Sequence, residues 1–307
     1  MSMNDLKQLK TKAHALPSTP GVYQMYDRHN EIIYIGKAVN LKRRVLSYFI
    51  NLSKREPHKK IMVRNITDFN TISVDTELDA LLLECQLIQR YHPIYNIRLN
   101  HYERYLYLTV DHKLHFTNST TTKPIFGPYQ NQRLVRKVQP ILDNLYFKDL
   151  NSWHYQIRVF DPKNVHIDYD IALKELIDFF RGRTDAVEQR MIDNRDFAAK
   201  IEKFEPAQHW NEELQILREF SNQNQRFERF LQQDKIAVIP LSNQTNKLYY
   251  IKHGKLLKTQ VIRNTSKIKK KSFNFSNPQQ IMKRSQLDQS KIIESYLYTK
   301  AIKTVEL

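Results

Sequence analysis

The alternation of apolar and polar residues predicts a β-hairpin close to the start of the chain. Residues 21–26 alternate as a half-buried strand does, residues 27–30 carry turn-forming side chains, and residues 31–35 return as a second strand. Gly36 is expected to break this second strand just before Lys37, either to let the backbone approach a ligand or to leave the sheet sharply.

Helical periodicity begins after the hairpin. Asn40 is a suitable N-cap for a helix over residues 41–50, and Pro57 can open a second helix near residues 59–66. Residues 69–74 are a third strand candidate.

A longer helix is predicted over residues 77–91. Thr76 is its N-cap, Asp79 stands where a capping box places its acidic residue, and the pair His92-Pro93 ends the helix. This order of strands and helices predicts an α+β fold for residues 1–100, with a small mixed β-sheet flanked by helices.

The patterns beyond residue 100 predict three further regions. Residues 101–168 are expected to form a β-containing middle region, with a strand at residues 105–110 and a turn at residues 126–129.

Residues 169–234 show helical periodicity throughout and suit an antiparallel helical hairpin with one exposed face. Residues 235–307 are expected to form a C-terminal strand and helix segment, with strands at 236–241, 248–252 and 256–263, Gly254 in a turn, and a helix over 285–302.

The charge of the chain limits which kinds of partner it is expected to bind. Its 49 Lys and Arg residues against 32 Asp and Glu residues give a net charge of +17 at pH 7. Solubility of a small domain needs only about 2–8 charges, so the excess indicates a polyanion. No apolar run approaches the ~18 residues of a membrane span, and no signal peptide or lipidation motif is visible. Nucleic acid is therefore favoured over a membrane. The run Lys267–Lys271 is either a DNA contact or a solvated linker.

Cysteine is nearly absent. The single residue, Cys85, allows neither an intrachain disulfide nor a cysteine metal cluster, which favours a cytoplasmic protein. Cys85 itself is most simply a small packing residue.

Glu84 is the sharpest chemical clue. On a helix it shares one face with Ala80, Leu81, Leu87 and Ile88. A carboxylate buried on such a face needs a cation or a proton. Alternatively, Glu84 lies at the edge of the face and reaches water.

Cationic and phenolic side chains gather in the hairpin and the helix after it. Arg44 and Tyr48 are spaced i,i+4 and project from one helical face, whereas Arg43 points elsewhere and suits a nucleic-acid backbone contact. Tyr23 and Tyr34 lie on paired strands. Taken alone, Arg44 and Tyr48 could belong to a basic surface helix with a packed tyrosine, and Tyr23 and Tyr34 could simply pack across the strands. Together with Glu84 they indicate a one-metal site that cuts phosphodiesters.

A family resemblance covers the same residues. The segments Leu16–Tyr23, Ile33–Leu41 and Arg44–Phe49 resemble the GIY-YIG nuclease family, in particular the N-terminal nuclease of UvrC, the incision subunit of bacterial nucleotide excision repair. Residues 77–96 resemble the metal-carboxylate helix and closing asparagine of that family. The catalytic set that the resemblance implies is Tyr23, Tyr34, Lys37, Arg44, Tyr48, Glu84 and Asn96.

The resemblance also implies a role for each of these residues. Glu84 would be the sole protein ligand of one Mg²⁺ or Mn²⁺ ion. Arg44 would neutralise charge on the phosphoryl oxygens. Tyr34 or Tyr23 would orient the attacking water, with Lys37 or the metal stabilising the phenolate. Tyr48 and Asn96 would fix the phosphate and the helix that carries Glu84. Gly21 and Gly36 would have structural roles in the backbone. The DNA contacts would include Lys37, Lys42 and Arg43.

A weaker resemblance continues downstream. Residues 126–129 resemble a turn found after the UvrC nuclease domain, and the region 185–220 resembles the helical hairpin that contacts the helicase subunit UvrB. The cysteine cluster of many UvrC proteins is missing, so no iron–sulfur cluster is expected. Nothing resembling an RNase H-like nuclease follows in the sequence. In this respect the architecture resembles Cho, the short UvrC homologue that incises only on the 3′ side of a lesion.

Three hypotheses follow. The first is a Cho-like, metal-dependent nuclease that acts on damaged double-stranded DNA and is recruited by UvrB. The second is a stand-alone nuclease that recognises DNA structure without UvrB. The third is a non-catalytic regulator that binds DNA or UvrB, although such a protein would have no need of Glu84.

Overall fold

The structure is a computed structural model that describes residues 3–50, 57–97, 99–118, 124–148, 158–241, 244–263 and 282–306. The chain forms two compact units. The first joins Met1–Glu103, Asp234–Phe273 and Ser285–Leu307, and the second joins Arg104–Gln233 and Asn274–Arg284. No helix in these described ranges has the length and apolarity needed to cross a membrane.

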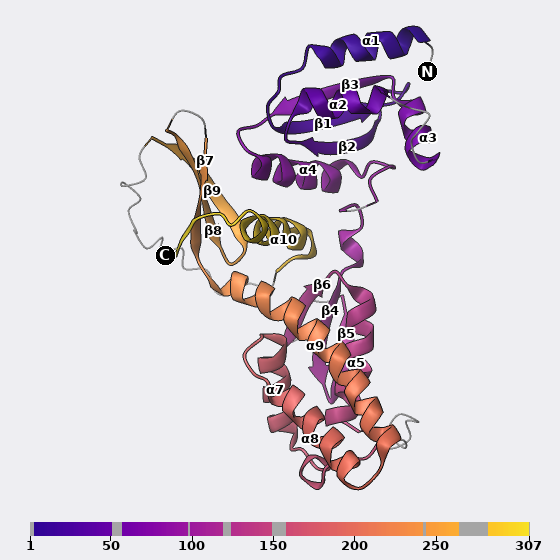
Figure 1. Ribbon diagram of the computed structural model, residues 1–307, viewed down its shortest axis with the longest axis vertical. Coiled ribbons are helices and arrows are strands. Elements are labelled where there is room, and N and C mark those ends of the chain that lie inside the picture. The colour runs from indigo at the N-terminus through magenta and orange to yellow at the C-terminus, as the bar shows by residue number, and fades with distance from the viewer. Residues whose placement is uncertain are drawn as a thin grey trace. The chain divides into compact units, whose positions relative to one another are not determined.

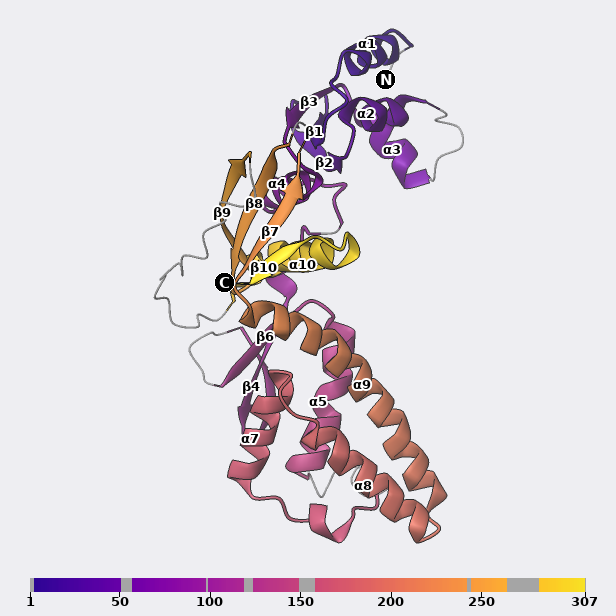
Figure 2. The same ribbon diagram turned by 60° about the vertical axis from the view of Figure 1, so that its left-hand side comes forward.

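The first unit begins with a three-stranded antiparallel sheet flanked by helices (Figures 1 and 2), which confirms the α+β prediction. The strand order is β2-β1-β3, so β1 is central and β2 is an edge strand. The elements are α1 (Met3–His14), β1 (Gly21–Tyr26), β2 (Ile32–Ala38), α2 (Leu41–Phe49), α3 (Pro57–Asn65), β3 (Asp68–Ser73) and α4 (Glu77–Tyr91). The sequence patterns did not predict α1.

The two helices beside the site begin where their N-caps predict. The Asn40 side chain accepts a hydrogen bond from the Arg43 N–H at the start of α2. Thr76 and Asp79 form a capping box at the start of α4, and His92 ends that helix in the left-handed conformation. These local bonds fix where Arg44, Tyr48 and Glu84 lie along their helices.

The two faces of the sheet bury different helices. Tyr23 and Met25 pack with α1, α2 and α3, whereas Val22 and Ile35 pack against Ala80 and Ile88 of α4. α2 and α4 thus pack against opposite faces of this sheet, and Figure 1 shows α4 running alongside β2. The site therefore draws side chains from α2 across one face and from α4 across the other.

Gly36 does not break the second strand, so that expectation was wrong. β2 runs through Gly36 to Ala38, and Gly36 pairs with Tyr23 of β1. The glycine is needed for space: a Cβ at position 36 would lie 2.2 Å from the Tyr23 hydroxyl and 2.4 Å from its Cζ. At position 21 a Cβ would lie 2.4 Å from the Ile72 carbonyl oxygen.

The rest of the first unit is a four-stranded antiparallel sheet of order β10-β7-β8-β9 with one helix beside it. Its elements are β7 (Lys235–Pro240), β8 (Asn246–Lys252), β9 (Lys255–Ile262), α10 (Arg284–Thr299) and β10 (Thr304–Glu306). The three predicted strands and the predicted helix are confirmed, and the short β10 was not predicted. The run Lys267–Lys271 lies outside the described residues.

The second unit combines a three-stranded sheet with helices. Its elements are β4 (Leu106–Asp111), β5 (Lys113–Thr117), β6 (Ile125–Tyr129), α5 (Gln132–Tyr146), α7 (Tyr169–Phe180), α8 (Ala186–Lys200) and α9 (Phe204–Gln232). Residues 126–129, predicted as a turn, belong to the strand β6. Pro128 is tolerated there because β6 is an edge strand.

Helices dominate this unit more than the sequence patterns indicated. The helix α5 lies in the region expected to be β-containing and has one strongly apolar face. Residues 169–234 are helical as predicted, and α8 and α9 run side by side as a hairpin (Figure 2), with α7 as an additional helix. The division of the chain into four regions stays a prediction.

Candidate active site

Three tyrosines meet on the face of the first sheet that α2 covers. The hydroxyls of Tyr23 and Tyr48 are 2.7 Å apart, and the ring centroids of Tyr23, Tyr34 and Tyr48 lie 5.6–6.2 Å from one another. Tyr23 is completely buried, whereas Tyr34 is partly exposed. The three phenols therefore form one connected group that reaches the surface at Tyr34.

Arg44 completes this group from α2. Its Nε donates a hydrogen bond of 3.3 Å to the Tyr23 hydroxyl, and its Cζ lies 5.2 Å from the centre of the Tyr48 ring. The i,i+4 spacing of Arg44 and Tyr48 thus places both side chains at one point, as the helix period predicts. Because Arg44 is exposed, its remaining N–H groups can reach a bound anion.

Burial controls the acidity of the phenols. Burial raises the pKa of Tyr23 well above its usual value, and the neighbouring phenols Tyr48 and Tyr34 add to this, while Arg44 opposes it. Burial likewise raises the pKa of Tyr34, with further contributions from Tyr48 and from the Glu84 carboxylate. Both phenols are therefore protonated at neutral pH and act as hydrogen-bond donors or proton relays.

Glu84 enters the site from α4, on the outer edge of β2. Its Oε1 accepts a hydrogen bond of 2.8 Å from the Lys37 backbone N–H. Burial raises the pKa of Glu84, and this exceeds the opposing effects of that N–H and of the Lys37 and Arg44 charges. A partly buried carboxylate whose own surroundings do not fully compensate its charge is suited to binding a cation.

The donor set fits a hard divalent ion rather than a metal cluster. In the described part of the chain no group of three or more His, Cys, Asp or Glu side chains comes together to hold a metal. A single carboxylate oxygen ligand suits Mg²⁺ or Mn²⁺, because such ions keep several water ligands and bind phosphate oxygens. Glu84 is the residue that could hold the ion.

The Lys37 side chain does not lie against the phenols. Its ammonium nitrogen is 2.5 Å from Oε1 of Glu77, in the first turn of α4. Glu77 was not among the predicted site residues, although its spacing of seven from Glu84 places both on one helical face. That spacing was the available clue.

Asn96 holds the backbone next to the site. Its side-chain oxygen accepts from the Ile35 N–H at 2.9 Å, and its amide nitrogen donates to the Ile35 carbonyl at 2.8 Å. Asn96 is 8% exposed, so its amide is committed to β2. Of the predicted DNA contacts, Lys42 and Arg43 lie on α2 outside the tyrosine group, with Arg43 exposed.

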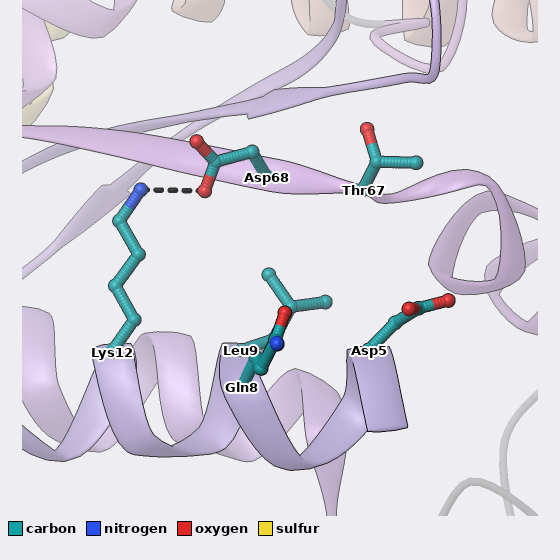
Figure 3. A pocket seen from close by; sticks show the side chains of 6 residues that line it. All are labelled: Asp5, Gln8, Leu9, Lys12, Thr67 and Asp68. Carbon is teal, nitrogen blue, oxygen red and sulfur yellow. Dashed lines mark hydrogen bonds and ion pairs between the residues drawn. The ribbon is translucent and has the colours of Figure 1, made fainter. Parts of the chain in front are cut away.

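A separate cavity lies away from these residues. It has a volume of about 600 Å³, opens between α1 and the start of β3, and contains an ion pair of 2.5 Å between Lys12 and Asp68 (Figure 3). Its lining residues are Asp5, Gln8, Leu9, Lys12, Thr67 and Asp68, none of which belongs to the predicted site.

Comparison with known proteins supports the assignment of the domain. The UvrC-like GIY-YIG domain family matches residues 19–97. The chain is 28% identical over 280 residues to the UvrABC system protein C of Alkaliphilus oremlandii (strain OhILAs), covering 82% of this chain and 45% of that protein. It is 30% identical over 276 residues to the same protein of Thermoanaerobacter sp. (strain X514), covering 81% and 45%. The chain spans about half the length of the curated relatives it matches.

A solved structure is also similar to part of the chain. The GIY-YIG N-terminal endonuclease domain of UvrC from Thermotoga maritima, bound to its catalytic magnesium ion, is 32% identical, with a TM-score of 0.27, and the match covers 32% of this chain and all of that one. Residues 19–97 are therefore a UvrC-like GIY-YIG domain, in a chain that is similar to UvrC proteins over most of its length.

Proposed function

We propose that this protein is a metal-dependent DNA endonuclease of nucleotide excision repair. The observation that carries the proposal is the group of three phenols and the Arg44 guanidinium on one face of the sheet, with the Glu84 carboxylate held at the outer edge of β2 within electrostatic reach of Tyr34 and Arg44. These groups supply what phosphodiester hydrolysis needs: a cation ligand, a permanent positive charge and hydroxyls that can move a proton. A non-catalytic regulator would need no such set.

Each residue of the site then has a defined task. Glu84 holds one Mg²⁺ or Mn²⁺, which when bound supplies positive charge at the phosphate and at the leaving oxygen. Arg44 binds the phosphoryl oxygens with the N–H groups that Tyr23 does not use. Tyr34, the partly exposed phenol of the group, contacts the attacking water and relays a proton: it accepts one from the water as it gives up its own, and one proton ends on the leaving 3′ oxygen.

The bond changes are those of hydrolysis. The water oxygen bonds to phosphorus as the bond from phosphorus to the 3′ oxygen breaks, leaving a 5′ phosphate and a 3′ hydroxyl. Asn96 fixes β2 through Ile35, and the Lys37 N–H fixes Glu84, so the carboxylate keeps its place during the reaction.

We further propose that the nick falls on the 3′ side of a lesion in double-stranded DNA and that UvrB recruits the protein. The resemblance of residues 19–97 to the GIY-YIG domain of UvrC supports the side of incision. The hairpin of α8 and α9 supports the partner, because Ile201 and Phe204 at its tip are 43% and 70% exposed. The cytoplasmic location and the absence of an iron–sulfur cluster stay predictions from the single cysteine.

The test is nicking of a duplex with one lesion, labelled at either end, with Mg²⁺ present. Wild type is compared with Glu84→Gln and with Glu31→Gln, a matched control at an exposed residue of the β1–β2 turn. Each is assayed with and without UvrA, UvrB and ATP. We expect one cut on the 3′ side that depends on UvrB, is lost in Glu84→Gln and is kept in Glu31→Gln. Cutting without UvrB would favour the structure-selective nuclease, and DNA binding without cutting would favour the regulator.

A further inference from the structure

The N-terminal end of α4 is bonded to a strand far away in the sequence. The hydroxyl oxygens of Thr76 and Tyr249, on β8, are 2.5 Å apart, and both residues are buried. The Thr76 hydroxyl donates to Oδ2 of Asp79 at 3.0 Å and accepts from the Asp79 N–H at 3.1 Å. Because a threonine hydroxyl has one proton, Tyr249 donates to Thr76.

A second residue of β8 binds the same turn. Nζ of Lys247 lies 2.8 Å from Oδ2 of Asp79 and 2.7 Å from Oδ2 of Asp75, with its side chain 12% exposed. Asp79 closes the capping box by accepting from the Thr76 N–H at 3.1 Å. Lys247 therefore binds the Asp79 carboxylate, which in turn caps the N-terminal end of α4.

Other contacts from the C-terminal segment reach the rest of α4. Nε2 of Gln89 donates to Oδ2 of Asp288 on α10 at 3.1 Å. Nζ of Lys300, just after α10, lies 3.4 Å from Oε2 of Glu77, whose other oxygen binds the Lys37 ammonium. α4 is thus bonded to the C-terminal segment near both of its ends.

These contacts bear on the reaction through the rigidity of the helix. Glu84 lies eight residues after Thr76, which is about 12 Å along the helix axis. A shift of the helix end therefore moves the carboxylate away from the place where it meets the ion, and groups that orient a metal ligand in this way affect the affinity for the metal.

We propose that Tyr249 and Lys247 are positioning residues for metal binding: through Thr76 and Asp79 they fix α4 so that Glu84 presents its carboxylate to the divalent ion. The inference rests on the proposed function, because it takes Glu84 as the metal ligand. It assigns the C-terminal sheet a role in the nuclease site itself.

The test measures Mn²⁺ binding by the intact protein, from the electron paramagnetic resonance signal of free Mn²⁺, beside nicking rates. In Tyr249→Phe we expect the dissociation constant for Mn²⁺ to rise about three- to tenfold, the range that loss of one hydrogen bond produces. The nicking rate at low Mn²⁺ should fall by a similar factor and recover at saturating Mn²⁺, while KM for DNA stays unchanged.

The matched control is Tyr250→Phe. Tyr250 is the next residue on β8, and its hydroxyl donates to Oε1 of Gln260 on the neighbouring strand at 3.2 Å. It should bind Mn²⁺ as the wild type does. A second pair of variants changes Lys247: Met removes the positive charge of the side chain and Arg keeps it. Lys247→Met should weaken Mn²⁺ binding, whereas Lys247→Arg should retain most of it.

The outcomes separate the inference from the proposed function. Wild-type Mn²⁺ binding in both Tyr249→Phe and Lys247→Met would overturn the inference. If Tyr249→Phe fails to fold, the Lys247 pair decides alone, since a loss of binding shared equally by Met and Arg would also overturn it. Glu84→Gln tests the function separately: if it binds Mn²⁺ and cuts like the wild type, the proposed function fails.

Discussion

At the scale of single residues, the contact between Tyr23 and Gly36 shapes the phenol group. The Tyr23 hydroxyl fills the space that a side chain at position 36 would take, and this brings it within 2.7 Å of the Tyr48 hydroxyl. The two residues pair across β1 and β2, so the missing side chain of Gly36 leaves the space that the Tyr23 ring occupies. The reason for the glycine is steric rather than conformational.

Gly36→Ala should therefore displace the buried Tyr23 ring. We expect unfolding to become easier by about 1–3 kcal/mol, the usual cost of overpacking, and nicking to fall by about 10²-fold or more. Urea denaturation and single-turnover nicking measure the two effects. Loss of stability with an unchanged rate would show that Tyr23 takes no part in the reaction.

The raised pKa of Glu84 predicts how activity depends on pH. Because burial raises this pKa, the carboxylate takes up its proton at a higher pH than an ordinary glutamate, and the rate should fall as the pH drops through that raised value. Metal and proton compete for the same group. Tenfold more Mn²⁺ should move the acid midpoint down by up to about one pH unit, in rate profiles recorded at two Mn²⁺ concentrations. A midpoint that ignores Mn²⁺ would contradict the role of Glu84.

At the scale of secondary structure, the outer edge of β2 builds the site. The outward backbone groups of this edge strand bond to α4 and to the segment after it: Lys37 N–H to Glu84, Ile35 to Asn96, and the Ile33 carbonyl to the Tyr95 N–H at 3.1 Å. The edge is thus closed against pairing with another strand. The same bonds hold Glu84 beside the sheet.

Asn96→Ala tests this closure. It leaves the buried N–H and C=O of Ile35 without their partner, so we expect the free energy of unfolding to drop by about 2–4 kcal/mol. Asn70→Ala, at an exposed position of β3, should change it by less than about 0.5 kcal/mol. Chemical denaturation of both variants is the measurement, and equal small effects would show that the Asn96 bonds contribute little.

At the scale of the whole molecule, the net charge of +17 should speed encounter with the DNA that we propose as the substrate. Six phosphate contacts would make the logarithm of the binding constant fall with a slope of about −5 against the logarithm of salt concentration. The affinity should then drop by about 10³-fold between 50 and 200 mM salt.

The double variant Lys42→Gln/Arg43→Gln should reduce that slope by about two, measured by fluorescence anisotropy over a salt series. Lys163→Gln is the control, because this exposed lysine is paired with Asp193 at 2.9 Å in the second unit. An unchanged slope in the double variant would remove α2 from the DNA-binding surface.

Local patterns alone determined much of this protein. Asn40, Thr76 and the pair His92-Pro93 marked helix boundaries correctly, because a cap acts through bonds within a few residues. Alternating residues marked β1, and strand-forming runs marked the three strands β7, β8 and β9. The spacing of Arg44 and Tyr48 placed both side chains together because the helix period is fixed. The α+β class followed from such patterns, whereas the GIY-YIG domain was identified by its resemblance to a known family.

Only the tertiary structure decided what those residues touch. The ammonium of Lys37 pairs with Glu77, Asn96 bonds to the backbone of Ile35, and Tyr249 bonds to Thr76. Each partner lies at least 40 residues away in the sequence. Which residues meet at such separations depends on how sheets and helices pack, and periodicity within one element carries no information about it. The sequence therefore determined the chemical groups of the site, and packing decided which of them hold one another in place.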